Sequence, residues 1–162
     1  MNQGRILKDH EYMRRFIEGE GVKLSFDPDA LMILKRASLI VFNALRVEIG
    51  EVSLCLIGVY DMGEQTPGSD TWSADGVTYY TQAPDGRTIY GVLLSTQAIM
   101  MGADYLLMVL IHELEHIRCR GDYRPNRWHT ERFENQLNDL LRVFQDRTGM
   151  RLVNDYAGYG ES

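Results

Sequence analysis

Residues 112–129 read HELEHIRCRGDYRPNRWH and contain two histidines four positions apart, a glutamate between them and a third histidine at the end. On an α-helix, residues four apart differ by about 40° around the axis, so His112 and His116 project from the same face. Two imidazoles placed in this way can bind one zinc ion, while Glu113 can reach a metal-bound water and take its proton. The spacing therefore predicts a helix that carries zinc ligands and a general base.

A plain amphipathic helix is the alternative, with the two histidines and Glu113 as neighbours on an exposed face. The apolar residues at 109–111, just before the motif, favour instead a helix that is buried on one side. Glu115 stands where HExxH enzymes usually carry an uncharged residue. We expect this carboxylate either to perturb the site or to face solvent.

The length of 162 residues predicts one domain, 1–162, with a buried core. A formal net charge of −6 argues against nucleic acid as a partner, because domains that bind nucleic acid carry a basic surface. No apolar stretch approaches the roughly 20 residues that a membrane span needs, and the charged N-terminus lacks the apolar core of a secretory signal. The composition predicts a cytoplasmic protein without membrane contact and leaves the oligomeric state open.

Helical patterns dominate both ends of the chain, and strand patterns dominate its middle. Apolar residues recur at helical spacing over 5–18, and Asp27 before Pro28 predicts the start of a second helix. The segment 83–86 (Ala-Pro-Asp-Gly) predicts a hairpin turn between two strands. The predicted strands are 52–60, 77–82 and 87–95.

Ser95 or Thr96 predicts the start of a helix over 97–119, with a break near Gly102, so the histidine motif lies on its second half. A last helix is predicted over 129–147. The order of elements predicts an α+β domain with a short mixed sheet. Its parts are a helical region 1–50, a sheet region 51–95, the active-site and C-terminal helices 96–148, and a loose tail 149–162.

A catalytic zinc ion usually has three protein ligands and one place for water. After His116, the candidates for the third ligand are Asp122, His129, Glu131 and Glu134. His129 stands at the start of the last predicted helix, after a loop long enough to return it to the metal. Either glutamate would instead make a two-histidine, one-glutamate site. The residues alone leave these alternatives open.

The stretch WHTERF, residues 128–133, resembles the pattern His-Gly-x-x-Phe that follows HExxH in SprT-like metallopeptidases and in related phage-encoded putative metallopeptidases. The resemblance covers roughly residues 88 to 134. It implies a small zincin-like domain with an HExxH active-site helix, Zn²⁺ as cofactor and a protein or peptide substrate. It also implies that His129 is the third ligand and that Phe133 packs in the core.

The chain departs from that family pattern at three points: Thr130 replaces the glycine, Glu115 is charged, and the C-terminal zinc-ribbon cysteines of many relatives are absent. The resemblance further implies that the strand over 88–94 is the sheet edge beside the metal. An extended peptide could pair with that edge through the main chain of Tyr90 and Val92. The competing interpretation is a catalytically silent, metal-stabilised binding module of the same fold.

The group that would stabilise the developing oxyanion has no sequence pattern of its own. Tyr123, Arg124 and Arg127 are candidates only because they follow the motif closely in the chain.

Overall fold

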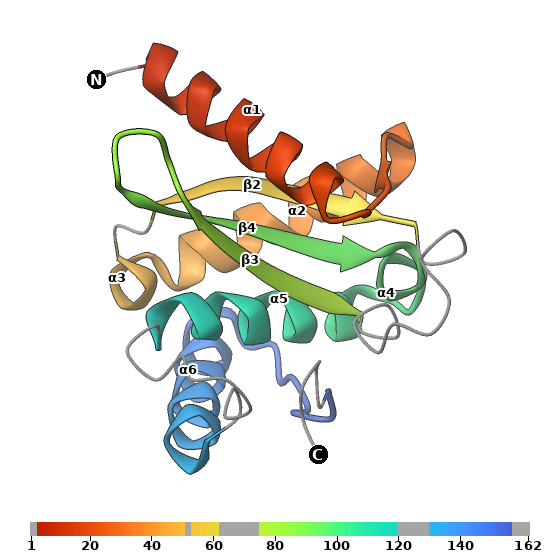
Figure 1. The fold of residues 1–162 in the computed structure, drawn as a ribbon. Coiled ribbons are helices and arrows are strands. Elements are labelled where there is room, and N and C mark those ends of the chain that lie inside the picture. Colours follow the sequence, from red (N-terminus) through yellow and green to blue (C-terminus); the bar gives the residue numbers. More distant parts are fainter. Residues whose placement is uncertain (1–2, 51–52, 62–74, 120–129, 157–162) are drawn as a thin grey trace.

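The computed structural model describes residues 3–50, 53–61, 75–119 and 130–156 (Figure 1). Within these ranges the order of elements follows the predicted series of helices, sheet and helices, except that a two-residue strand, which the sequence did not predict, lies between the first two helices. The elements are α1 (Gln3–Gly19), β1 (Leu24–Ser25), α2 (Pro28–Ala44), α3 (Arg46–Ile49), β2 (Leu54–Tyr60), β3 (Gly76–Gln82), β4 (Thr88–Ser95), α4 (Thr96–Met100), α5 (Ala103–Arg118) and α6 (Glu131–Thr148).

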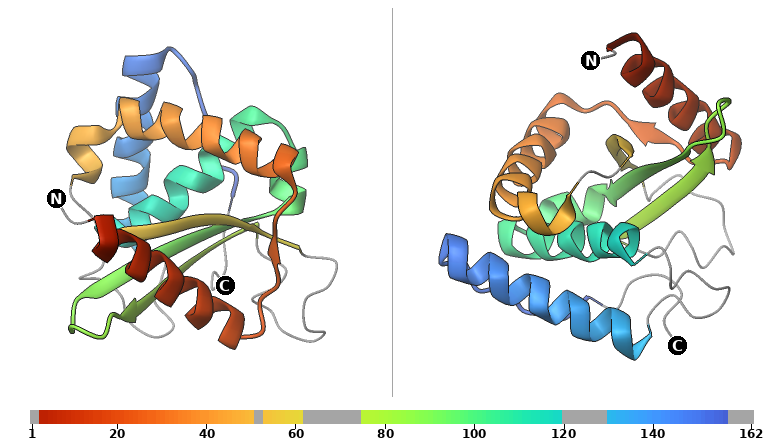
Figure 2. Two further views of the ribbon diagram at one scale, coloured as in Figure 1. Left: turned by 90° about the horizontal axis from the view of Figure 1, so that it is seen from above. Right: turned by 90° about the vertical axis from the view of Figure 1, so that its left-hand side faces the viewer.

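The four strands form one mixed sheet in the order β1-β2-β4-β3. β2 and β4 run parallel, whereas β1–β2 and β3–β4 are antiparallel pairs. Helix α1 covers one face of the sheet, α2 and α5 cover the other, and α6 packs beyond α5 (Figures 1 and 2). The predicted α+β fold with a short mixed sheet is confirmed.

Side-chain caps mark the starts of α2 and α4. The carboxylate of Asp27 accepts a hydrogen bond from Ala30 N at 2.9 Å, directly before the proline that opens α2. Ser95 caps α4, and its hydroxyl accepts from Ala98 N at 2.9 Å. The predicted break at Gly102 separates α4 from α5. None of the helices in the described ranges is both long and apolar enough to cross a membrane.

Apolar side chains gather on both faces of the sheet. The larger cluster lies between the sheet and α2, α5 and α6, and nearly every residue of α5 from Leu106 to Ile117 is buried in it. The smaller cluster lies between the sheet and α1 and includes Met13 and Ile17. The histidine motif therefore lies on a helix that is enclosed between the sheet and α6.

Strand β4 lies inside the sheet, so the prediction that 88–94 forms the edge is wrong. The N–H of Tyr90 donates to the carbonyl of Ser53 at 2.8 Å, on the β2 side. Val92 lies between Ile57 of β2 and Thr78 of β3, and both Tyr90 and Val92 are buried. Their main chain belongs to the ladder and cannot pair with a peptide. Among the described strands, β3 is the edge next to α5.

The prediction of a loose tail is also wrong for residues 149–156. Gly149 ends α6 in the left-handed conformation, with φ of 76°, and redirects the chain along α5. Leu152 and Tyr156 are buried against the core. The rest of the predicted tail, 157–162, lies outside the described residues.

Candidate metal centre

Helix α5 brings His112, Glu113 and His116 together as the motif predicts. One donor atom from each of the three residues lies within 4.8 Å of the other two. The residues are 0%, 3% and 7% exposed, which excludes the interpretation of an exposed polar helix face. Two imidazoles and a carboxylate are donors that suit zinc and other first-row divalent metals, so these residues fit a metal ion.

Aromatic rings from outside α5 hold the two imidazoles in place. The ring of Phe133, at the start of α6, is stacked on His116 with 4.4 Å between centroids and an interplanar angle of 22°. The same ring lies 5.2 Å from His112, and the ring of Tyr156 lies 4.8 Å from His112 on edge. The prediction that Phe133 packs in the core is confirmed, since it is 1% exposed.

The carboxyl group of Glu113 is bound by residues of two other segments. Thr78 of β3 donates its hydroxyl to Glu113 Oε1 at 2.7 Å, and Tyr156 of the C-terminal segment also hydrogen-bonds the carboxyl. Burial raises the pKa of Glu113 to about 7, while these two hydrogen bonds lower it. A buried carboxyl whose pKa lies near neutrality is suited to exchange a proton.

Gly76 lets the edge strand come close to α5. A Cβ atom at this position would lie 2.6 Å from Val109 Cγ1 and 3.0 Å from Glu113 Oε2. The Tyr156 hydroxyl accepts from Gly76 N at 2.9 Å and lies 3.0 Å from Gly76 O. Three segments therefore meet here, through Gly76 of β3, Tyr156 of the C-terminal segment and Glu113 of α5.

Glu115 lies outside the metal group and does not face solvent. It is 0% exposed and forms an ion pair with Arg118, with 2.6 Å between Oε1 and Nη1. The thiol of Cys119 contacts its other carboxylate oxygen at 2.6 Å. The extra carboxylate is therefore accommodated by its own polar partners next to the site.

Two of the four candidates for the third ligand, Glu131 and Glu134, lie among the described residues. His129 and Asp122 lie outside them, as do the oxyanion candidates Tyr123, Arg124 and Arg127. Glu131 is exposed, Glu134 is hydrogen-bonded at 3.5 Å by the side chain of Asn154, and neither belongs to the group of metal donors found among the described residues. Thr130 caps α6, because its hydroxyl accepts a hydrogen bond from Phe133 N at 3.0 Å.

Three residues of the site were not predicted from the sequence: Gly76, Thr78 and Tyr156. The glycine and the threonine lie on a strand that is separated from the motif by more than 30 positions, and nothing in that strand's alternation marks them. Tyr156 lies in a segment without helical or strand periodicity.

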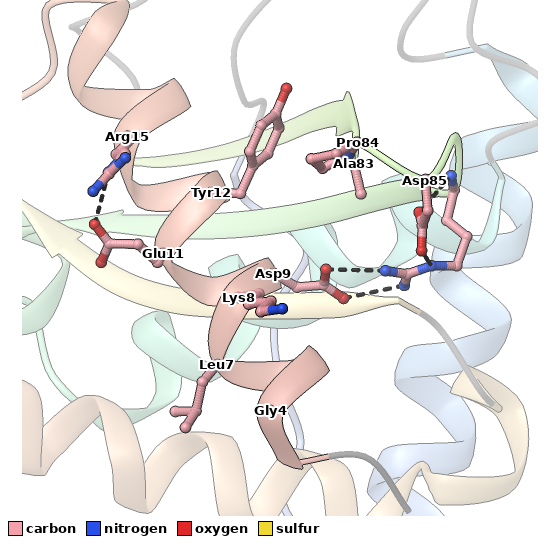
Figure 3. A pocket seen from close by; sticks show the side chains of 11 residues that line it. Gly4, Leu7, Lys8, Asp9, Glu11, Tyr12, Arg15, Ala83, Pro84 and Asp85 are labelled. Atoms are coloured by element: carbon pink, nitrogen blue, oxygen red, sulfur yellow. Dashed lines mark hydrogen bonds and ion pairs between the residues drawn. The ribbon is translucent and has the colours of Figure 1, made fainter.

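A separate surface groove of about 720 Å³ lies between α1 and the β3–β4 turn (Figure 3). Helix α1 lies on the opposite face of the sheet from α5, the helix that carries the histidines (Figure 1). Five of its charged side chains form ion pairs within the groove. Arg87 binds Asp9 and Asp85, and Arg15 binds Glu11. The groove has no donor group comparable to that on α5.

Comparison of the chain with protein-family models, with curated proteins and with solved structures gave no match.

Proposed function

We propose that this protein is a zinc-dependent metallopeptidase of the HExxH type. The observation that carries the proposal is the buried group of His112, Glu113 and His116 on one helix. The two histidines would hold the ion, with His129 as the third ligand. The position of α6 supports that choice, because its first turn packs on His116 through Phe133.

The residues of the chain have distinct roles in this proposal. Bound zinc would supply Lewis-acid polarisation of a water molecule and of the substrate carbonyl. Glu113 would take the proton from that water and deliver it to the amine that leaves. The low exposure of Glu113 keeps bulk water from competing for the carboxylate.

The peptide would add to the outer edge of β3. In the β3–β4 ladder, Asp75 O accepts from Ser95 N and Ala83 N donates to Arg87 O, so odd-numbered residues of β3 pair with β4. Even-numbered residues therefore direct their N–H and C=O groups away from β4. Tyr80 presents such groups along the edge that passes α5, where an extended substrate can form main-chain hydrogen bonds.

One observation favours the competing function of a metal-stabilised binding module. Thr78 and Tyr156 enclose the Glu113 carboxyl. Burial of His112, Glu113 and His116 is also expected of a metal site that only stabilises the fold. The two functions differ in what Glu113 must do, because a structural site needs no general base.

Replacement of Glu113 by glutamine separates these functions. We expect Glu113→Gln to retain about one zinc per chain, because the imidazoles are unchanged, and to lose hydrolysis by roughly a hundredfold or more. Metal analysis of protein purified without added metal, together with cleavage of a responsive peptide, provides the measurement. Hydrolysis at the wild-type rate would refute the proposed mechanism.

Alanine substitutions identify the third ligand. We expect His129→Ala to lose zinc affinity sharply, whereas Glu131→Ala and Glu134→Ala retain it. Competition with a chromogenic chelator measures the affinity of each variant. If a glutamate variant loses zinc and His129→Ala does not, the site belongs to the two-histidine, one-glutamate class.

A further inference from the structure

The Glu113 side chain is held by groups that belong to neither its own helix nor the candidate ligands. Thr78 Oγ1 lies 2.7 Å from Glu113 Oε1 and 3.1 Å from Glu113 O, so a single hydroxyl contacts both ends of the residue. The hydroxyl of Tyr156 contacts the carboxyl from the C-terminal segment. Because Glu113 is only 3% exposed, solvent cannot easily replace either contact.

Both contacts come from groups whose own positions are fixed independently of Glu113. Thr78 is held in the β3–β4 ladder opposite Val92. The Tyr156 hydroxyl accepts a hydrogen bond from Gly76 N at 2.9 Å, and the Tyr156 ring packs on edge against His112 and Tyr105.

A glutamate side chain has three rotatable bonds, and a general base must hold its oxygen within hydrogen-bond reach of the proton that it takes. Two fixed hydroxyls remove most of that freedom before substrate arrives. We propose that Thr78 and Tyr156 are positioning residues that orient the Glu113 carboxyl for proton transfer. This inference rests on the proposed peptidase function and deepens it, because it assigns roles to two residues outside the motif.

Removal of each hydroxyl tests the inference kinetically. Since a misplacement of about 1 Å can cost on the order of a hundredfold in rate, we expect Thr78→Val and Tyr156→Phe each to lower kcat roughly tenfold to a hundredfold. KM should change by less than about twofold and zinc content should be unchanged, because neither hydroxyl is a ligand. Thr78→Ser, which restores the hydroxyl, should recover most of the activity.

Two comparisons show whether the effect passes through Glu113. Thr88→Val and Tyr12→Phe make the same chemical changes on β4 and α1, away from the site, and should leave kcat unchanged. In a Glu113→Gln background, Thr78→Val and Tyr156→Phe should cause no further loss, because there is no base left to orient. A full additional loss in that background, or wild-type kcat in both single variants, would overturn the inference.

A readout without metal or turnover keeps the two proposals distinguishable. In metal-free protein, the ¹³C resonance of the Glu113 carboxyl, assigned through Glu113→Gln, should shift in Thr78→Val and Tyr156→Phe but not in Thr88→Val. If it shifts while the wild-type protein hydrolyses no peptide, the contact exists and the peptidase function fails. If it does not shift, the positioning inference fails whatever the activity.

Discussion

Gly76 lies so close to α5 that a single added methyl group would not fit. A Cβ atom there would lie 2.6 Å from a Val109 methyl carbon and 3.0 Å from Glu113 Oε2, so either β3 or the carboxyl would have to move. We expect Gly76→Ala to lower the free energy of unfolding by about 1–3 kcal/mol, as overpacked cores do. Chemical denaturation measures this change.

The matched control for that substitution is Gly19→Ala at the end of α1, where a Cβ atom would meet nothing within 4 Å. It should be neutral or slightly stabilising, because alanine restricts the unfolded chain more than glycine does. If Gly76→Ala is as stable as Gly19→Ala, the close approach of β3 to Glu113 is wrong.

The site residues that the sequence predicted are those whose positions depend on spacing within one helix. The face shared by His112 and His116 follows from helical geometry, and their burial agrees with the apolar residues before them. Thr78 and Tyr156 could not be predicted, because each meets Glu113 only after the strand order and the path of the C-terminal segment are known. Such contacts join residues 35 and more positions apart.

Helix starts were predictable because a cap acts over three residues. Asp27 and Ser95 each accept a hydrogen bond from the N–H three residues later, as their side chains and neighbours indicate. The order of strands was not predictable in the same way. The almost continuous apolar run of β4 is nevertheless typical of a strand with neighbours on both sides, and it was a signal against the edge position.

Under the proposed function, the substrate pairs with the edge strand β3 instead of β4, and proline substitution tests this proposal. The N–H of Tyr80 points away from β4, so Tyr80→Pro removes a donor from the outer edge and leaves the β3–β4 ladder intact. We expect the variant to fold, to retain zinc and to raise KM for an extended peptide several-fold, because one main-chain hydrogen bond contributes about 1 kcal/mol.

Tyr80→Ala is the control, because it removes the same ring, which packs 6.5 Å from Tyr90, but keeps the N–H. The difference in KM between the proline and alanine variants measures the main-chain contribution alone. Equal KM values in two folded variants would show that the peptide does not pair with β3 at this position.

Over the whole molecule, three separate parts of the chain converge on α5. The edge strand contributes Thr78, the start of α6 contributes Phe133, and the segment after α6 contributes Tyr156. The sheet region, the last helix and the C-terminal segment therefore all depend on the packing around the histidines. A ligand that fixes those histidines should stabilise the fold as a unit.

Zinc removal is the corresponding prediction. The donors of His112 and His116 lie within 4.8 Å of each other in the folded chain, and the proposed third ligand, His129, comes from a later part of the sequence. The folded protein should therefore bind zinc much more tightly than the unfolded chain. At free zinc about a hundredfold above Kd, this difference stabilises the fold by about 2.7 kcal/mol, and chelation should lower Tm by several degrees. Scanning calorimetry with and without chelator measures the shift.

Two histidine variants serve as controls for this prediction. His116→Ala should show no shift in Tm, because it lacks a ligand. His10→Ala on α1 should respond like wild type, because the exposed imidazole that it removes lies on the opposite face of the sheet. A shift of equal size in His116→Ala would mean that zinc acts elsewhere on the molecule.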